Sequence, residues 1–183
     1  MKKIFLLSLL SAFYICSFSQ EQTQPLIKNG DMELWRDNKE MPNNWNSYHT
    51  ILREGIFSRS TDARSGKNAI EVNFEPQREH DNRRFFTFPM KLSAYKYKVT
   101  FHFKGDADIR FITLTKKGND ASGKSSDINL VGAPALGKIE AKEWTAYSIS
   151  FDVKDTADYQ LFICVNSAKK FLIDDVSMEV LDN

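Results

Sequence analysis

The sequence predicts an all-β protein, a two-sheet antiparallel β-sandwich of the jelly-roll type. Short segments carry apolar residues at every second position, which is the period of a strand with one face on a core. Clusters rich in Gly, Asn, Asp and Ser separate these segments, as turns do between strands. No segment keeps a helical apolar period over a useful length. Many short strands joined by turns are typical of sandwiches and jelly rolls.

Six segments alternate clearly enough to be assigned as strands. They are residues 69–74, 95–104, 109–115, 147–153, 159–165 and 170–181. The apolar side of the second segment consists of Tyr97, Val99, Phe101 and Phe103. In the fifth segment, Phe162 and Cys164 make the second face apolar as well. The expected turns lie at residues 65–67, 104–106, 117–120 and 166–167. Residues 116–143 alternate weakly, so we expect a long loop there, with room for one short strand.

The first 19 residues have the three parts of a secretory signal peptide. A basic start precedes an apolar run at residues 4–15, and small residues follow it. The run of about 12 residues is shorter than the ~20 that span a bilayer, so we expect cleavage rather than a membrane span. The mature protein would be secreted, periplasmic or held at the cell surface of a bacterium. Lipid attachment at Cys16 is a weaker alternative, because Ile15 stands where a lipidation signal has a small residue.

The rest of the chain suits one domain. After a polar leader at residues 20–25, residues 26–183 are expected to form a single sandwich. Loss of Lys2 and Lys3 leaves 23 basic against 24 acidic residues, so the formal charge changes from +1 to −1. This balance gives no sign of nucleic acid or an anionic membrane as a partner, and we expect a monomer. Cys164 then has no partner for an internal disulfide, and its apolar neighbours indicate a buried thiol.

Three segments together resemble the galactose-binding-like jelly rolls, especially the calcium-containing carbohydrate-binding modules that accompany xylanases and related glycanases. Residues 26–33, LIKNGDME, followed by MPNNW at 41–45, are similar to the opening motif NGxFE…PxxW. Residues 63–72, ARSGKNAIEV, are similar to the SGKxAxxV turn and strand. Residues 144–151 and 171–178, the latter FLIDDVSM, are similar to the closing strands. The order and spacing of the three segments are those of the family.

The resemblance covers most of the mature chain and implies a carbohydrate-binding domain. Its partner would be a polysaccharide or oligosaccharide, and it would work alone or beside a separate glycan-degrading enzyme. Trp45 and Trp144 match family positions that are usually structural, so we assign both to packing. Met32 replaces an aromatic residue of the pattern, and Leu34-Trp35 stands where many relatives have a Gly or Asn turn. These departures leave the identity of the glycan open.

Asp174 has the parity of a core position. The apolar residues on the same strand face are Leu172, Val176, Met178 and Val180. A bare carboxylate against a core is costly unless it is paired, hydrogen-bonded or bound to metal. The resemblance implies a structural calcium ion at this point. The implied ligands are the side chains of Glu33 and Asp174 and backbone carbonyls around Arg64 and Lys67. The alternative is that Asp174 caps a turn or pairs with a basic residue.

Sugar binding needs flat apolar faces and polar groups that satisfy hydroxyls. Trp35 departs from the family pattern near a turn and offers such a face, with Tyr48 following in a predicted strand. Thr100 and His102 alternate with the core residues of their strand and are expected to face outward. Arg110 and Gln160 are expected to share a similar face. The predicted glycan contacts are therefore Trp35, Tyr48, Thr100, His102, Arg110 and Gln160.

No motif in the sequence points to an enzyme. The chain has no Gly-x-Ser-x-Gly elbow, no His-Glu-x-x-His, no phosphate loop and no cysteine cluster. Glycoside hydrolysis needs two carboxylates across a scissile bond, and no acidic pair stands out from surface charge. His102 could act as a general base, but a lone outward histidine is more often solvated or in contact with sugar. The alternatives are a structural or adhesion sandwich that contacts a protein, and a glycoside hydrolase.

Overall fold

The computed structural model describes residues 24–36, 41–47, 56–73, 84–119, 125–131 and 136–181. All regular secondary structure within these ranges is β-strand, which confirms the all-β prediction. The strands are β1 (Trp45–Ser47), β2 (Phe57–Ser60), β3 (Ala69–Asn73), β4 (Arg84–Thr87), β5 (Met90–Leu92), β6 (Lys96–Asn119), β7 (Ser125–Val131), β8 (Gly137–Asp152) and β9 (Ala157–Val180). No helix in these ranges is long and apolar enough to cross a bilayer. The expected signal peptide and most of the expected leader lie outside the described residues.

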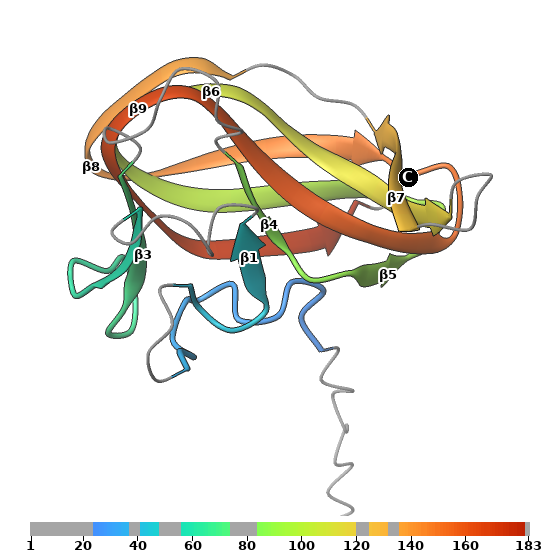
Figure 1. Ribbon diagram of the computed structural model, residues 1–183, viewed down its shortest axis with the longest axis horizontal. Coiled ribbons are helices and arrows are strands. Elements are labelled where there is room, and N and C mark those ends of the chain that lie inside the picture. The colour runs from blue at the N-terminus through green and yellow to red at the C-terminus, as the bar shows by residue number, and fades with distance from the viewer. Residues whose placement is uncertain are drawn as a thin grey trace, which may run out of the picture.

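One antiparallel sheet connects the strands and is curled into a sandwich. β6 pairs with β9 along one side, and with β8 and β7 along the other. The opposite edge of β9 pairs with β5, β4 and β3 in turn, while β1 extends β4 and β2 extends β3. Figure 1 shows β6, β8 and β9 bending back at one end of the molecule, so that each runs through both layers. The predicted sandwich is therefore built from one hydrogen-bonded network.

The expected turns at residues 104–106 and 166–167 are wrong, because both segments continue a strand. The predicted strands that flank each turn are joined in β6 and β9 respectively. The register between β6 and β9 shifts several times near Gly105, as it does at β-bulges. Gly105 has a φ of 129°, and a Cβ there would lie 2.7 Å from the Lys170 carbonyl oxygen. The glycine therefore lets β6 bend closely against β9 instead of ending the strand.

Of the expectation for residues 116–143, the short strand is present as β7, but the long loop is wrong. β6 continues to Asn119, β7 follows, and β8 begins at Gly137. β7 pairs with the end of β6 from Leu114 onward. This pairing is made by backbone hydrogen bonds, which need no alternation of apolar side chains. The apolar pattern on which the prediction depended is therefore absent from a segment that still forms strands.

The core lies between the two layers. The four residues predicted as the apolar side of β6 are at most 2% exposed. Phe103 stacks on Phe171 of β9, with ring centroids 5.4 Å apart. A separate apolar cluster consists of Phe86, Phe162 and Cys164. Burial raises the pKa of the Cys164 thiol to about 11, so this residue packs and is no nucleophile at neutral pH.

Candidate functional site

The opening segment is fastened to β9 through Gly30. The Val176 N–H donates to the Gly30 carbonyl at 2.8 Å, and a Cβ on Gly30 would lie 1.9 Å from the Val176 carbonyl oxygen. The Asn29 side chain makes three hydrogen bonds of 2.8 to 2.9 Å with backbone groups nearby. The Trp45 indole N–H donates to the Asn29 carbonyl at 3.1 Å, and Trp45 is 3% exposed, so it packs as predicted. These contacts fix the loop that carries Glu33.

Glu33 fastens this opening segment to the turn at residues 61–68. The Lys67 and Asn68 N–H groups donate to Glu33 Oε1 at 2.7 and 2.8 Å, and the Asn68 side chain donates to Oε2 at 3.0 Å. The bonds from Lys67 and then Asn68 lower the pKa of Glu33. Gly66 has a φ of 60°, and a Cβ there would lie 2.3 Å from Glu33 Oε1. The positive φ therefore favours glycine, and an added Cβ would displace the Glu33 carboxylate from its hydrogen bonds.

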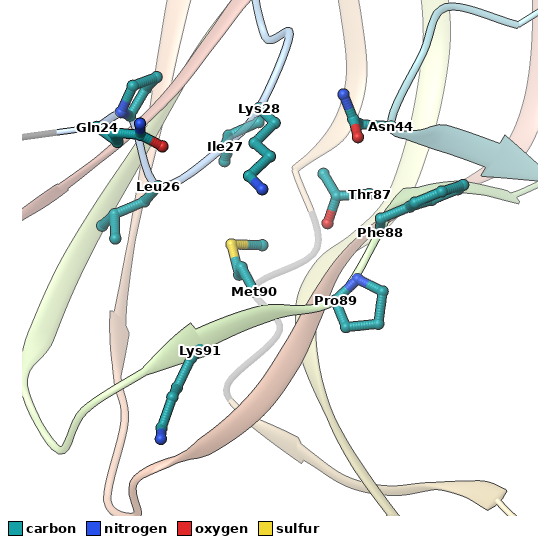
Figure 2. A pocket seen from close by; sticks show the side chains of 11 residues that line it. Gln24, Leu26, Ile27, Lys28, Asn44, Thr87, Phe88, Pro89, Met90 and Lys91 are labelled. Atoms are coloured by element: carbon teal, nitrogen blue, oxygen red, sulfur yellow. The ribbon is translucent and has the colours of Figure 1, made fainter.

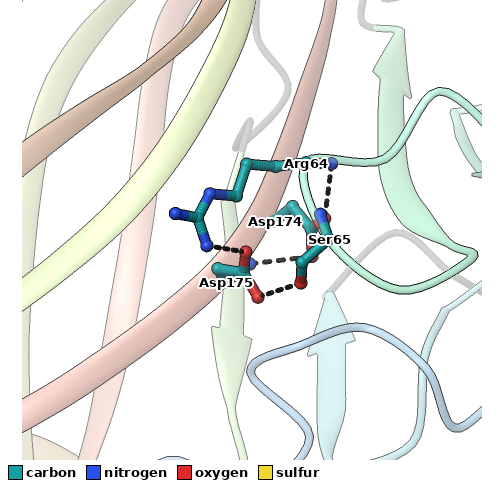
Figure 3. A network of polar contacts seen from close by, with 4 residues as sticks. All are labelled: Arg64, Ser65, Asp174 and Asp175. Carbon is teal, nitrogen blue, oxygen red and sulfur yellow. Dashed lines mark hydrogen bonds and ion pairs between the residues drawn. The ribbon is translucent and has the colours of Figure 1, made fainter.

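Asp174 fastens β9 to the same turn, as Figure 3 shows. The Arg64 and Ser65 N–H groups donate to Asp174 Oδ2 at 2.9 and 3.2 Å, and the Asp175 N–H donates to Oδ1 at 2.8 Å. Asp175 pairs with the Arg64 guanidinium at 2.9 Å and accepts the Ser65 hydroxyl at 2.8 Å. Burial of Asp174 raises its pKa to about 6 in spite of its three hydrogen bonds. We name the arrangement of Glu33, Asp174 and residues 61–68 the clasp.

In the clasp, N–H groups of the turn donate hydrogen bonds to the two carboxylates. A calcium ion between the carboxylates and the turn would instead need oxygen ligands from the turn. Each carboxylate accepts three hydrogen bonds, which leaves about one of its four lone-pair sites. The remaining oxygens of a calcium shell would have to come from carbonyls and water. Among the described residues, no group of three or more His, Cys, Asp or Glu side chains is placed to hold a metal. The two predicted side-chain ligands, Glu33 and Asp174, thus contact the predicted turn around Arg64 and Lys67, but they do so by accepting its N–H groups. Calcium at this point stays a prediction.

Asp62, in the turn at residues 61–68, holds Trp144 on the outer side of the sheet. Asp62 Oδ2 accepts the Lys104 ammonium at 2.7 Å, and Oδ1 accepts the Trp144 indole N–H at 3.3 Å. The hydrogen bond between Lys104 and Asp62 lowers the pKa of Asp62 and raises that of Lys104. The register between β6 and β8 shifts beside Gly105, so Trp144 lies in a bulge of β8, and its ring is half-buried. The clasp therefore positions an indole ring through Asp62.

Thr100 and His102 lie on the same face of β6 as Lys104. Both are half-buried and alternate with the core residues, as their parity predicts. The hydroxyls of Thr100 and Ser148 on β8 share a hydrogen bond of 2.8 Å. We name this surface the polar track. It consists of Asp62, Thr100, His102, Lys104, Trp144 and Ser148. It faces away from the core and combines one indole ring with carboxylate, ammonium, imidazole and hydroxyl groups.

Four of the six predicted glycan contacts lie elsewhere or outside the described residues. Gln160 is 4% exposed and donates to the Thr87 carbonyl at 2.8 Å, so its predicted place on an open face is wrong. The reason is that the outer face of β9 is buried here together with its inner face. Arg110 is exposed, on the part of β6 beyond Gly105. Tyr48 lies outside the described residues.

Trp35 does not join the polar track either. Its indole N–H donates to the Met32 carbonyl at 2.5 Å, and the ring packs against the core. The Arg59 guanidinium carbon lies 5.1 Å from the centre of the ring, which is the geometry of a cation–π contact. Arg59 thus occupies one face of the indole, and a sugar could stack there only by displacing it.

Sequence reasoning missed four residues of the polar track, which are Asp62, Lys104, Trp144 and Ser148. The resemblance assigned Trp144 to packing, whereas the structure leaves this residue partly exposed beside Asp62 and Lys104. Strand parity contained the signal for Trp144, because it is out of phase with the core residues Ile149 and Phe151. No comparable signal joins Asp62 to Lys104, since the two are 42 residues apart and meet only through the clasp.

Comparisons with known proteins agree on the fold. No family model and no curated protein matches the sequence. The CBM22-1 xylan-binding domain of Paenibacillus barcinonensis Xyn10C superposes with a TM-score of 0.50 at 13% identity, covering 76% of this chain and 87% of that one. A CBM4 structure gives 0.51 at 17% identity, with 85% and 99% covered. The active domain of bacteriophage CBA120 tailspike protein 4 gives 0.54 at 10% identity, with 86% and 21% covered. The chain has the β-sandwich fold of carbohydrate-binding modules.

Proposed function

We propose that this protein binds a polysaccharide or oligosaccharide on the polar track and catalyses no reaction. The observation that carries the proposal is the partly exposed side chain of Trp144. Its indole N–H is fixed by Asp62, which is itself paired with Lys104. An aromatic ring that is already held in place can stack on the apolar face of a sugar with little further loss of side-chain entropy. The track therefore suits a pyranose ring laid over Trp144.

Groups that can bind sugar hydroxyls lie beside the ring. One hydrogen bond joins Asp62 to Lys104, so the carboxylate keeps acceptor sites and the ammonium keeps donor hydrogens. The pair can bind two neighbouring hydroxyls, one as acceptor and one as donor. Thr100 and Ser148 add hydroxyls along the same face. The fold shared with a xylan-binding domain supports xylan as the first polysaccharide to test.

The acidic and thiol groups give no support to a catalytic role. Glu33 and Asp174 each use three acceptor sites on hydrogen bonds within the clasp, and Asp174 is fully buried. A glycosidase needs two carboxylates that face a scissile bond. The Cys164 thiol, with its pKa raised to about 11, stays protonated at neutral pH. These groups are better suited to holding the sandwich together than to chemistry.

The proposal includes export and a calcium ion at the clasp, each with its own test. The amino-terminal sequence of the secreted protein should begin near Gln20 if the signal peptide is cleaved. Calcium should raise the midpoint of thermal unfolding and a chelator should lower it, because an ion bound only to the folded state stabilises that state. An unchanged midpoint would remove calcium from the account and leave the hydrogen-bonded clasp. The proposal also includes a separate glycan-degrading enzyme as a partner, which would act on the glycan that this protein binds.

Binding by Trp144→Ala tests the proposed site. Affinity electrophoresis in gels that contain xylan, or another glycan found by array screening, should show binding weakened about 10- to 30-fold. Tyr95→Ala is the matched control, because Tyr95 is an exposed aromatic residue outside the polar track and 51% exposed. It should bind like the unmodified protein. The proposal fails if the unmodified protein binds no plant, host or microbial glycan, or if Trp144→Ala binds normally.

A further inference from the structure

A pocket of about 240 Å³ lies between the opening segment and the chain that leads from β4 into β5. Figure 2 shows the residues that line it, including Lys28, Asn44, Phe88 and Met90. It is smaller than the ~300 to 1,000 Å³ of pockets for drug-sized ligands, so it suits a single ring. It belongs to neither the polar track nor the clasp, since the described residues that line it are shared with neither.

The wall of this pocket is held in place by the backbone. The Phe88 N–H donates to the Asn44 carbonyl at 2.8 Å, which joins two sides of the wall. The Thr87 hydroxyl accepts the Leu161 N–H at 3.0 Å and anchors the strand that precedes Phe88. The side chain of Phe88 is nevertheless 45% exposed. The ring is thus fixed at its backbone and open at its face.

The charged side chains on the pocket wall are all basic. The described residues that line it include Lys28 and Lys91 and no acidic side chain. Lys91 faces Asp158 across the pairing of β5 with β9, and Figure 2 shows its side chain directed away from Lys28. Figure 2 shows Lys28 reaching toward the middle of the pocket, between Met90 and Thr87. Lys28 is therefore the cation available to a ligand.

We infer that this pocket binds one sugar ring that carries a carboxylate, a uronic acid residue. The Lys28 ammonium would bind the carboxylate, the faces of Phe88 and Met90 would contact the apolar side of the ring, and the Asn44 amide would bind a hydroxyl. The inference rests on the proposed function, because it takes the ligand to be a saccharide. It adds a second site, which is specific for a uronic acid residue that the glycan contains or ends in.

NMR titration with methyl glucuronoside and methyl glucoside tests the pocket. The unmodified protein should bind the glucuronoside with a dissociation constant at least about tenfold lower, as expected for one charge-assisted hydrogen bond. Lys28→Gln should remove this preference without weakening glucoside binding. Lys91→Gln is the matched control and should keep the preference. Phe88→Ala should weaken the binding of both sugars.

The results separate this site from the polar track. Trp144→Ala should bind methyl glucuronoside normally, and Lys28→Gln should bind neutral xylan normally. Equal affinity for the two methyl glycosides, or an unchanged preference in a Lys28→Gln protein with normal thermal unfolding, would overturn the inference. Loss of the preference in Lys91→Gln would overturn the assignment to Lys28. Loss of xylan binding in Trp144→Ala alone bears on the proposed function and leaves the pocket unaffected.

Discussion

The two halves of β6 present their outer faces differently, although the same strand forms both. Before the bend at Gly105, Thr100 is half-buried and belongs to the polar track. After the bend, Thr113 is 1% exposed, and Phe162, its register partner on β9, is 2% exposed. The inner faces of both halves are buried alike. One half of the strand therefore has an open outer face and the other is covered on both sides.

This difference shows that an outward direction does not guarantee exposure in a curled sandwich. Beside the first half, β8 carries the short side chains of Ala146 and Ser148, which leave the surface open. Beside the second half, β9 and β4 carry the stacked rings of Phe162 and Phe86, whose centroids are 4.6 Å apart. A glycan can reach only the first. The placement of the polar track follows from this contrast.

Phe162→Ala is expected to have the largest effect on stability. The ring is almost fully buried and stacks on Phe86, so its loss should cost about 3 to 5 kcal/mol of unfolding free energy. Thr100→Ala, on the open half, should change stability by about 0.5 kcal/mol or less. Urea denaturation of both variants measures the contrast. Similar losses in the two variants would mean that the two halves do not differ in the way described.

Gly66→Ala should have the next largest effect, because it breaks the clasp that positions the open half. The added Cβ would lie 2.3 Å from Glu33 Oε1 at a φ of 60°, and we expect a cost of about 2 to 4 kcal/mol. Gly137→Ala is the control. Gly137 has a φ of 68° with nothing within 4 Å of the added atom, so only the backbone cost of about 1 kcal/mol applies. Equal shifts of the thermal midpoint would show that Glu33 does not restrain the turn.

The pH dependence of stability should carry a smaller signature of Asp174. Its folded pKa of about 6 lies above the ordinary value of 3.8, so the folded state binds the proton more tightly than the unfolded state. Its contribution to stability is therefore fully present below pH 3.8 and is lost as the pH rises through about 6. Glu33 and Asp62, whose pKa values are lowered, contribute in the opposite direction.

Comparison with Asp174→Asn isolates this group from the other two. The variant should be less stable overall, because its amide has a single acceptor oxygen. That oxygen can replace Oδ2, which accepts the Arg64 and Ser65 N–H groups, or Oδ1, which accepts the Asp175 N–H group, but not both. The difference in unfolding free energy between the unmodified protein and the variant should become smaller from pH 4 to pH 7. A difference that stays constant or grows over this range would contradict the raised pKa of Asp174.

The sequence predicted the inner faces of the strands better than the outer ones. Alternation identified the core side of β6 correctly up to Phe103. It could not show the register shift between Ile109 and Phe111, after which the residues on the core side are Ile112 and Leu114. The apolar second face of residues 159–165 did indicate that β9 is covered on both sides. Gln160 belongs to this segment, so the same pattern indicates its burial.

The clasp and the polar track show a similar limit for long-range contacts. The opening and closing motifs directed Glu33 and Asp174 to one turn, which is where the structure has them. The motifs could not show whether N–H or carbonyl groups of that turn face the carboxylates, because this depends on backbone angles such as the positive φ of Gly66. The contact of Asp62 with Trp144 depends on the same turn. Such contacts exist only after the fold has formed.

The indole N–H signals of the three tryptophans provide the most direct test of the polar track. Trp45 is buried, Trp35 lies under Arg59, and Trp144 is partly exposed beside Asp62, so each signal reports a different place. Each signal can be assigned from the variant in which that tryptophan is replaced by phenylalanine. When a bound xylan oligosaccharide or array-selected glycan is titrated, the Trp144 signal should move while those of Trp45 and Trp35 stay in place. A glycan that binds while the Trp144 signal remains unmoved would contradict the account.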